Sequence, residues 1–235
     1  DFSSFSELVK VLQGSSPQAL KIKTAIVDAM TTNETFWFRD DLQFLELRET
    51  ILAEIFERKT GSIKVWSAAC SSGQEPYTIS MCVEEINRKI SRPRNVQIIA
   101  TDISEEILLE AKAAVYSELA LSRGIDDLAK QRLFQKVHNG YKLNADISRN
   151  VRFQQFNLLK PFSVLGRFDV IFCRNVLIYF SEQVKRDILS RMVDSLEPGG
   201  YLFLSSTEAM PASIKELVPV RGGRARYFKK LIKSS

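Results

Sequence analysis

The sequence contains few residues of the types that mark several specialised classes of protein. Its three cysteines, Cys70, Cys82 and Cys173, are odd in number and scattered, so they provide no disulfide framework. It has one histidine, His138, and we expect no bound metal. No run of about 18 apolar residues could span a bilayer, and no leader-like N-terminal segment with a cleavage site is present. We therefore expect a reduced, cytoplasmic protein without membrane insertion.

The composition that is present suits a globular protein. The chain has 235 residues, of which 45% are hydrophobic and 26% charged, as in one medium-sized domain with an appendage. A net charge of +5 and a pI near 9.1 make acidic partners worth considering, whether nucleic acid, protein or lipid. The basic clusters at residues 21–23 and 221–230 are each read most simply as a solvated face.

The N-terminal part of the chain has helical spacing of its apolar residues. Two short helices are expected within residues 2–30, separated by the breaker "GSSP". A third is expected from near Asp40, with Asp40 or Asp41 as its N-cap, to a stop at Gly61. We interpret residues 1–60 as an N-terminal helical subdomain.

In residues 61–235, short β-prone runs alternate with helical segments. The expected strands are "IKVWSAAC", "VQIIAT", "VRFQQF", "FDVIFC", "YLFLSS" and "ARYFKKL". The expected helices are "EPYTISMCVEEINRKI", "SEEILLEAKAAVY", "SEQVKRDILSRMVDSLEPGG" and a weak one at "ASIKEL". This alternation is typical of βαβ units, so the predicted fold class is α/β, with a doubly wound, mostly parallel sheet.

One segment, at about residues 133–150, interrupts the alternation. The helical run "DDLAKQRLF" leads into "FQKVHNGYKL", in which Asn139-Gly140 predicts a type I′ hairpin. We interpret this segment as a small antiparallel β insertion on the main domain. It is either a partner-docking element or an insertion without a function of its own.

Two loops at predicted strand ends carry residues suited to a ligand, because ligands of open α/β sheets bind beyond the carboxyl ends of the strands. In "AACSSGQEPY", Gly73 would let the backbone approach a ligand, and Pro76 suits the first turn of a helix. In "IIATDIS", Asp102 could accept hydrogen bonds from ribose hydroxyls, while Ser104 caps the next helix. Neither G-x-G-x-x-G nor a P-loop motif is present, which favours a nucleoside without phosphates.

The segment "MTTNETFWFRDD" sets polar capping residues against three consecutive aromatics and an arginine. The aromatic side chains of "FWF" would either wall a site or pack into the core, and core packing is the simpler expectation for each. Arg39 is placed where aromatic walls could hold its guanidinium and where it could bind a carboxylate.

Six strings in order together resemble the CheR-type chemotaxis receptor methyltransferases, from about Phe2 to the C-terminus: "TTNETFWFRD", "VWSAACSSGQEPYTI", "ATDIS", "FQQFNLLKPF", "FDVIFCRNVLIYF" and "LEPGGYLFLSSTE". The resemblance implies a seven-stranded-type methyltransferase sheet over residues 61–235 and S-adenosylmethionine as cofactor, with S-adenosylhomocysteine as product. It implies a protein-glutamate O-methyltransferase that converts glutamate side chains on the cytoplasmic helices of chemoreceptors to methyl esters in chemotaxis adaptation. We expect a monomer that does not act on nucleic acid.

Carried over position by position, the resemblance assigns one side of a cofactor site. It implies that Asn33, Thr35 and Arg39 contact the cofactor from the helical side, with Arg39 reaching the methionyl end. It also implies that Glu75 contacts the cofactor after the first strand and that Asp102 holds the ribose.

The resemblance assigns the other side of the site to later loops. It implies that Asn157 and Leu158 flank the adenine and that Arg174 and Asn175 line the site after "FDVIFC". Tyr179 would lie close to the transferred methyl group. Together with Arg39, we expect Tyr179 to be catalytic, by orienting the acceptor carboxylate.

The chemistry of a glutamate acceptor agrees with these residue types. A glutamate with a pKa near 4.3 arrives ionised at neutral pH and needs no general base. Its attack on a sulfonium neutralises both charges, so a drier site with fixed dipoles should help. Positioning the carboxylate in line with the S–CH₃ bond could supply several kcal/mol, roughly 7–11 in the best intramolecular models.

The chain also differs from the family pattern. Family members usually begin with further helical residues, so protein methylation could be weaker than cofactor binding if those helices seat the receptor. The receptor-facing surface of the family is basic and helical, and residues 21–23 are the nearest match. Some relatives bind a short receptor peptide on the β insertion, and residues 134–153 do not indicate whether this chain does.

Four other functions share part of this pattern. A nicotinamide dehydrogenase is disfavoured because the sequence lacks the glycines that bind a pyrophosphate. Absence of NAD binding in titration calorimetry would exclude it. A nucleic-acid methyltransferase fits the basic pI, but Arg174-Asn175 stands where amino-methylating enzymes carry an acidic or Asn residue followed by prolines. A small-molecule methyltransferase would not need the β insertion. A cofactor-sensing module without turnover is disfavoured by Arg39, Asp102 and Tyr179.

Overall fold

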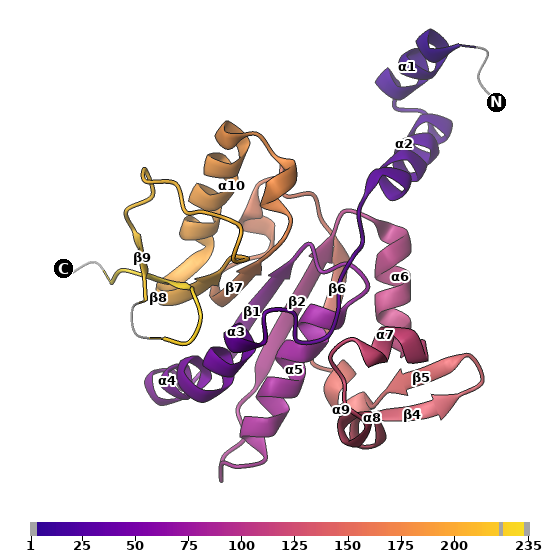
Figure 1. Ribbon diagram of the computed structural model, residues 1–235. Coiled ribbons are helices and arrows are strands. Elements are labelled where there is room, and N and C mark those ends of the chain that lie inside the picture. The colour runs from indigo at the N-terminus through magenta and orange to yellow at the C-terminus, as the bar shows by residue number, and fades with distance from the viewer. Residues whose placement is uncertain (1–3, 221–222, 233–235) are drawn as a thin grey trace.

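The computed structural model describes residues 4–220 and 223–232 (Figure 1). Phe2, where the first predicted helix starts, and Arg221, at the start of the C-terminal basic cluster, lie outside these ranges. Within them, no helix combines the length and the apolar character needed to cross a bilayer.

The chain alternates helices and strands after an all-helical start. The helices are α1 (Phe5–Gln13), α2 (Pro17–Met30), α3 (Asp41–Glu46), α4 (Leu52–Arg58), α5 (Gln74–Asn87), α6 (Glu105–Ala113), α7 (Glu118–Ser122), α8 (Asp127–Leu133), α9 (Ala145–Ser148) and α10 (Glu182–Ser195). A π-helical turn, η1 (Leu47–Ile51), joins α3 to α4, and 3₁₀ turns occur at η2 (Phe162–Val164) and η3 (Leu177–Tyr179). The strands are β1 (Ile63–Ala68), β2 (Val96–Asp102), β3 (Val115–Tyr116), β4 (Phe134–Val137), β5 (Gly140–Leu143), β6 (Val151–Gln155), β7 (Phe168–Cys173), β8 (Leu196–Phe203), β9 (Leu217–Pro219) and β10 (Phe228–Lys230).

The main sheet has seven strands in the order β6-β2-β1-β7-β8-β10-β9. Neighbours from β6 to β8 are parallel, and β10 runs antiparallel to both β8 and β9. The chain passes outward from β1 to β2 and β6, and then returns to β7 on the other side of β1. The predicted doubly wound, mostly parallel α/β sheet is confirmed, and its strand order reverses between β1 and β7, where such sheets bind ligands.

Helices cover both faces of this sheet (Figure 1). Successive residues of a strand point to opposite faces. Val65 of β1 therefore packs with Leu47 of η1 in one cluster of buried side chains, whereas Trp66 packs with Ile188 of α10 in another. Both clusters are formed by buried apolar side chains, so the strands are held between two packed layers.

The N-terminal helices differ in how they meet the sheet. α1 and α2 project from the rest of the molecule (Figure 1), and α2 starts as "GSSP" predicts, with the Ser16 hydroxyl accepting the N–H of Ala19 over 3.1 Å. By contrast, Leu47 and Leu52, in the stretch from α3 to α4, belong to the same buried cluster as the sheet. The boundary near residue 60 stays a prediction.

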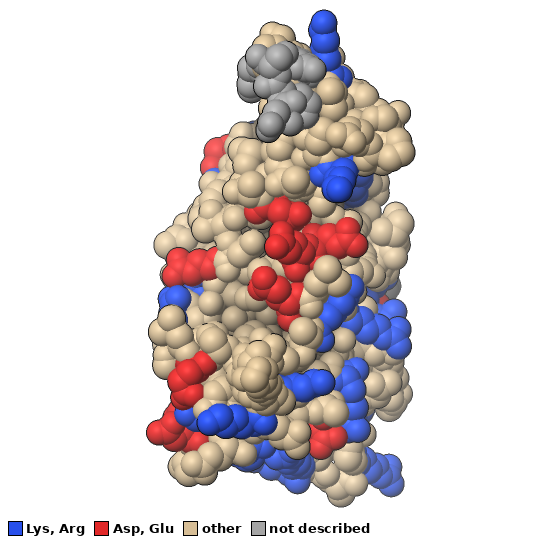
Figure 2. Space-filling model, turned by 90° about the vertical axis from the view of Figure 1, so that its right-hand side faces the viewer, with Lys and Arg blue, Asp and Glu red and all other residues tan. Residues whose placement is uncertain are grey.

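Charge is mixed on the face turned to the viewer in Figure 2. Acidic side chains gather in the middle of that face, and basic side chains lie beside and below them. The net charge of +5 therefore does not form a single basic surface there.

The predicted β insertion is present, with one more strand than expected. β3, β5 and β4 form an antiparallel sheet, and Val137 pairs with Gly140 across the turn. The predicted turn type is wrong: type I′ needs positive φ at both central residues, but His138 and Asn139 have none, and the positive φ falls on Gly140 at 143°. The helix expected through Tyr116 ends at Ala113, because Ala114 adopts a left-handed φ of 52°.

Three other expectations were wrong in detail. Asp40 occupies the N-cap position of α3 but has a left-handed φ of 57° and makes no side-chain cap. β8 begins at Leu196, so "EPGG" lies inside the strand and shifts its register against β7. The weak helix at "ASIKEL" is absent, and Leu217 starts β9 instead, because pairing with β10 outweighs a weak local preference.

Candidate functional site

A cavity of about 320 Å³ lies at the carboxyl ends of the parallel strands. All ten site residues predicted from the sequence line it: Asn33, Thr35, Arg39, Glu75, Asp102, Asn157, Leu158, Arg174, Asn175 and Tyr179. They come from the linker between α2 and α3, from the last residue of β2 and from the segments that follow β1, β6 and β7. Residues from five separate parts of the chain therefore meet at the carboxyl edge of the sheet, where ligands of such folds bind.

The loop after β1 is tied to both of its neighbours. The backbone N–H of Ser71 donates to Asp102 Oδ2 over 2.8 Å, and the Ser71 hydroxyl donates to the carbonyl of Asn33 over 2.9 Å. Ala69 and Ser71 have left-handed φ values of 58° and 50°, a turn that small residues adopt with least crowding. One serine thus joins the end of β1 to the end of β2 and to the linker.

Gly73 has a structural role different from the expected one. It does not line the cavity, so the expectation that it brings the backbone to a ligand is wrong. Its φ is 92°, and an added Cβ would lie 3.1 Å from Ala111 Cβ and 3.2 Å from the Tyr116 hydroxyl oxygen. Glycine is needed here because the turn is left-handed and α6 packs closely against it. Pro76 lies in the first turn of α5, as predicted.

Asp102 is buried at the end of β2. Its Oδ2 accepts the N–H of Ser71 and its Oδ1 accepts the N–H of Ser104 over 3.1 Å. Burial raises the pKa of Asp102, and the backbone N–H groups oppose that rise. Each carboxylate oxygen keeps capacity for a further donor, as a ribose hydroxyl requires. Ser104 caps α6, as predicted, by accepting the N–H of Ile107.

Arg174 and Glu75 form a buried ion pair within the cavity wall. Arg174 Nη1 donates to Glu75 Oε2 over 3.0 Å, and Nη2 donates to Asp40 Oδ2 over 2.6 Å and to the carbonyl of Arg39. The other Glu75 oxygen accepts the hydroxyl of Ser67 over 2.7 Å. Burial raises the pKa of Glu75, and the charge of Arg174 opposes that rise. Arg174 therefore positions neighbouring residues, and its pairing with Asp40 explains why Asp40 does not cap α3.

The aromatic stretch in the linker divides between the cavity and the core. The guanidinium carbon of Arg39 lies 5.4 Å from the centroid of the Phe36 ring, and Arg39 Nη1 donates to the carbonyl of Glu34 over 3.1 Å. Trp37 is buried, with its ring centroid 4.9 Å from that of Tyr116. The expected core packing is therefore confirmed for Trp37 and wrong for Phe36, which lines the cavity and supports the guanidinium of Arg39.

Glu208 shapes the loop after β7, and sequence reasoning did not single it out. Its buried carboxylate accepts the backbone N–H groups of Asn175, Val176 and Leu177 over 3.1, 3.1 and 2.8 Å. Asn175 has a left-handed φ of 59°, a conformation that Asn tolerates better than most residues. The available signal was an acidic residue a few positions after the end of the strand in "YLFLSSTE".

Tyr179 and Asn157 complete the cavity from opposite loops. Tyr179 lies in η3 and is 62% exposed, and its hydroxyl has no hydrogen-bond partner in the described part of the chain. Asn157 Oδ1 accepts the N–H of Leu159 over 2.8 Å, which leaves its amide N–H groups free, and Leu158 is buried. Further lining residues that were not assigned to the site are Met30, Thr31, Thr32, Glu34, Phe36, Phe44, Ala69, Cys70, Ser71, Ile103, Phe156, Val176 and Phe180.

The charges of the lining suit a cationic or neutral ligand. The lining contains three carboxylates, those of Glu34, Glu75 and Asp102, and two guanidinium groups, those of Arg39 and Arg174. Arg174 is ion-paired, so among the described lining residues Arg39 is the arginine that remains available to bind an anion. A carboxylate with spare acceptor capacity and apolar neighbours suits a nucleoside. S-adenosylmethionine, a nucleoside with a positive sulfur and one carboxylate, fits this set of groups.

The chain is similar to known chemotaxis protein methyltransferases over most of its length. The family described as "CheR methyltransferase, SAM binding domain" matches residues 33–226. Chemotaxis protein methyltransferase 1 of Pseudomonas aeruginosa is 46% identical over 211 residues, which cover 88% of this chain and 76% of that protein. A chemotaxis protein methyltransferase of Vibrio anguillarum is 43% identical over 222 residues, which cover 93% of this chain and 79% of that protein.

Among solved structures, magnesium protoporphyrin IX methyltransferase from Synechocystis PCC 6803 with bound SAH aligns with a TM-score of 0.46 at 12% identity, covering 92% of this chain and 95% of that chain. The identification as an S-adenosylmethionine-dependent enzyme of chemotaxis rests on the family match and on the relatives above 40% identity. This chain belongs to the CheR methyltransferase family.

Proposed function

We propose that this protein methylates glutamate side chains on the cytoplasmic helices of chemoreceptors and converts them to methyl esters. The observation that carries the proposal is the convergence of ten residues, expected from the family motifs, on one cavity at the sheet crossover. A cytoplasmic location and a monomeric state belong to the same proposal. So does the division into a helical subdomain over residues 1–60 and a methyltransferase domain over residues 61–235.

We assign the cofactor-binding roles as follows. The carboxylate of Asp102 accepts the ribose hydroxyls, and Asn157 and Leu158 flank the adenine. Glu75 faces the methionyl end, where its negative charge suits an ammonium group, and Arg39 binds the carboxylate there. Asn33, Thr35 and Asn175 line the remaining wall, and Arg174 holds Glu75 in place.

The chain's own residues act on the acceptor by orientation and not by proton transfer. When bound, S-adenosylmethionine supplies an electrophilic methyl group that an ionised carboxylate attacks directly. The described lining contains no histidine, and an acceptor glutamate with an ordinary pKa needs none. Tyr179 donates its free hydroxyl to the acceptor carboxylate, and Phe36 and Phe180 exclude water from the reacting atoms.

Labelling with methyl-labelled cofactor tests the proposal. The protein is incubated with cytoplasmic fragments of chemoreceptors, and the expected product is label on glutamate that mild base releases as methanol. Glutamate-to-alanine receptor fragments serve as the matched control and should take up no label. Label that survives base, or that appears on nucleic acid or a small molecule, would reject the glutamate ester.

A further inference from the structure

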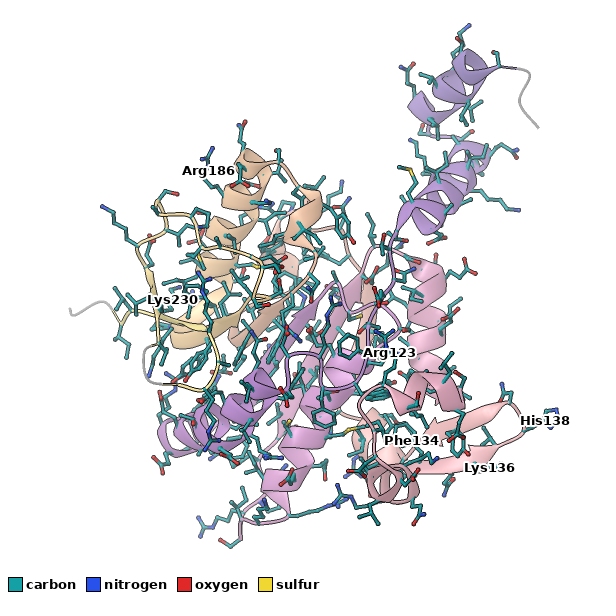
Figure 3. All side chains as sticks on the ribbon, viewed as in Figure 1. Arg123, Phe134, Lys136, His138, Arg186 and Lys230 are labelled. Carbon is teal, nitrogen blue, oxygen red and sulfur yellow. The ribbon has the colours of Figure 1, made fainter. Side chains whose placement is uncertain are left out.

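A second arginine lies beside the cavity, outside the set of residues expected from the sequence. Arg123 directly follows α7, and its Nη2 lies 3.0 Å from Glu34 Oε1. Its guanidinium carbon lies 4.7 Å from the centroid of the Phe36 ring, which Arg39 also contacts. The position of Arg123 is labelled in Figure 3. One aromatic ring thus supports two guanidinium groups.

Arg123 borders the cavity at its rim. Glu34 and Phe36 line the cavity, whereas Arg123 does not, so it reaches them from the outer side. The linker is fixed to this point of the chain, because the backbone N–H of Trp37 donates to the Arg123 carbonyl over 3.2 Å. The position of Arg123 therefore does not depend on the carboxylate of Glu34.

The ion pair with Glu34 can exchange with an external acid. The side chains of Arg123 and Glu34 are 49% and 64% exposed, and pairs this exposed contribute little to stability. The Phe36 ring continues to support the guanidinium when Glu34 leaves. A planar guanidinium on an aromatic ring is well suited to bind a carboxylate.

We propose that Arg123 and Phe36 form a carboxylate-binding site at the cavity rim, which Glu34 occupies in the free protein and an acidic side chain of the acceptor helix occupies during methyl transfer. This inference rests on the proposed function. Residues three or four apart on a helix are neighbours, with about 5–6 Å between Cβ atoms. One helix can therefore present a glutamate to the methyl-transfer centre and a second acid to Arg123. Arg123 is then a specificity-determining residue, and Glu34 competes with the acceptor.

Steady-state kinetics with a chemoreceptor fragment test this site. Arg123→Gln should raise the KM for the fragment about tenfold, as expected for the loss of one charge-assisted hydrogen bond, with kcat unchanged. Glu34→Gln should lower that KM, because the competing carboxylate is gone. The calorimetric affinity for S-adenosylmethionine should stay the same in Arg123→Gln, because Arg123 does not line the cavity.

A matched control separates the rim site from a general loss of surface charge. Arg167 pairs with Glu197 over 3.1 Å and is 51% exposed, but it precedes β7 at the opposite end of the sheet from the cavity. Arg167→Gln should leave the KM for the fragment unchanged. Arg123→Lys, which keeps the charge but loses the planar fork, should recover part of the lost affinity.

Three results would overturn the rim site. They are an unchanged KM in Arg123→Gln, a fall in cofactor affinity equal to the rise in KM, and a Glu34→Gln effect that persists in the Arg123→Gln background. If Arg123→Gln fails to fold, Glu34→Gln decides alone, and an unchanged KM rejects the site. Failure of the wild-type protein to methylate any receptor fragment would reject the proposed function instead.

Discussion

Arg174 donates a hydrogen bond to Glu75 across 3.0 Å, and this ion pair joins the end of β7 to the first turn of α5. The Arg174 side chain is only 2% exposed, and its second amino group binds Asp40. Two acidic residues and one arginine from distant parts of the chain therefore link the elements that form the cavity wall. The arginine expected to line the site is occupied in positioning the residues around it.

Arg174→Met should destabilise the fold by about 3–5 kcal/mol, because Glu75 would remain buried without its cation. The free energy of unfolding, measured by urea denaturation, provides the check. Arg167→Met removes an exposed pair and should cost no more than about 1 kcal/mol. Equal losses in the two variants would contradict the role assigned to the buried pair.

Arg39→Ala should lower kcat/KM for methyl transfer by about ten- to hundredfold, which corresponds to the roughly 1.5–3 kcal/mol of a charge-assisted hydrogen bond. Its guanidinium makes one hydrogen bond, to the carbonyl of Glu34, so folding should change little. Initial rates and a thermal melt measured together distinguish the two effects. A variant with wild-type rates would remove Arg39 from the site.

Tyr179→Phe removes a hydroxyl that has no partner among the described residues, so the free energy of unfolding should change by less than about 0.5 kcal/mol. If this hydroxyl orients the acceptor, kcat should fall about tenfold. Single-turnover rates with a receptor fragment measure this. An unchanged rate would assign Tyr179 to the cavity wall only.

Asp102 should make stability depend on pH with a sign unusual for a carboxylate. Burial raises its pKa in the folded state, so between the ordinary pKa of about 3.9 and the raised value the folded state binds more protons than the unfolded state. The free energy of unfolding then falls as pH rises through this window. The stability advantage of wild type over Asp102→Asn should be larger at about pH 4 than at pH 7.

Glu49 provides a control of opposite sign. A hydrogen bond from Arg224 lowers the pKa of Glu49, so its contribution is present at neutral pH and lost on acidification. The advantage of wild type over Glu49→Gln should therefore shrink as pH falls below about 4.5. Urea denaturation of wild type and both variants at several pH values tests the two predictions. They are contradicted if the stability differences for Asp102→Asn and Glu49→Gln change with pH in the same direction.

Gly73→Ala and Gly166→Ala separate backbone strain from crowding. Both glycines have left-handed φ values, 92° and 86°, but an added Cβ meets Ala111 at 3.1 Å in the first case and nothing within 4 Å in the second. Gly166→Ala should cost about 1–2 kcal/mol from φ alone, and Gly73→Ala should cost more. Equal losses of unfolding free energy in the two variants, measured by urea denaturation, would show that α6 shifts to accommodate the new methyl group.

The accuracy of the sequence predictions depended on how local each signal was. The helix starts at Ser16 and Ser104 were predictable, because a capping serine bonds a backbone N–H three residues ahead. β9 was not, because a strand of three residues, Leu217–Pro219, exists only through pairing with β10. The site positions were predicted because strand ends and family motifs mark them, whereas the roles given to them stay predictions.

By itself, the sequence determined the alternation of strands and helices and the loops that line the cavity, because apolar periodicity and strand-end residues can be recognised from neighbouring positions. Only the tertiary structure decided which side chains meet inside that frame. In the folded protein, the guanidinium of Arg174 donates to Glu75, 99 residues away, and Arg123 donates to Glu34, 89 residues away. Such pairs depend on how the chain packs in space, so they cannot be predicted from a periodic pattern along the sequence.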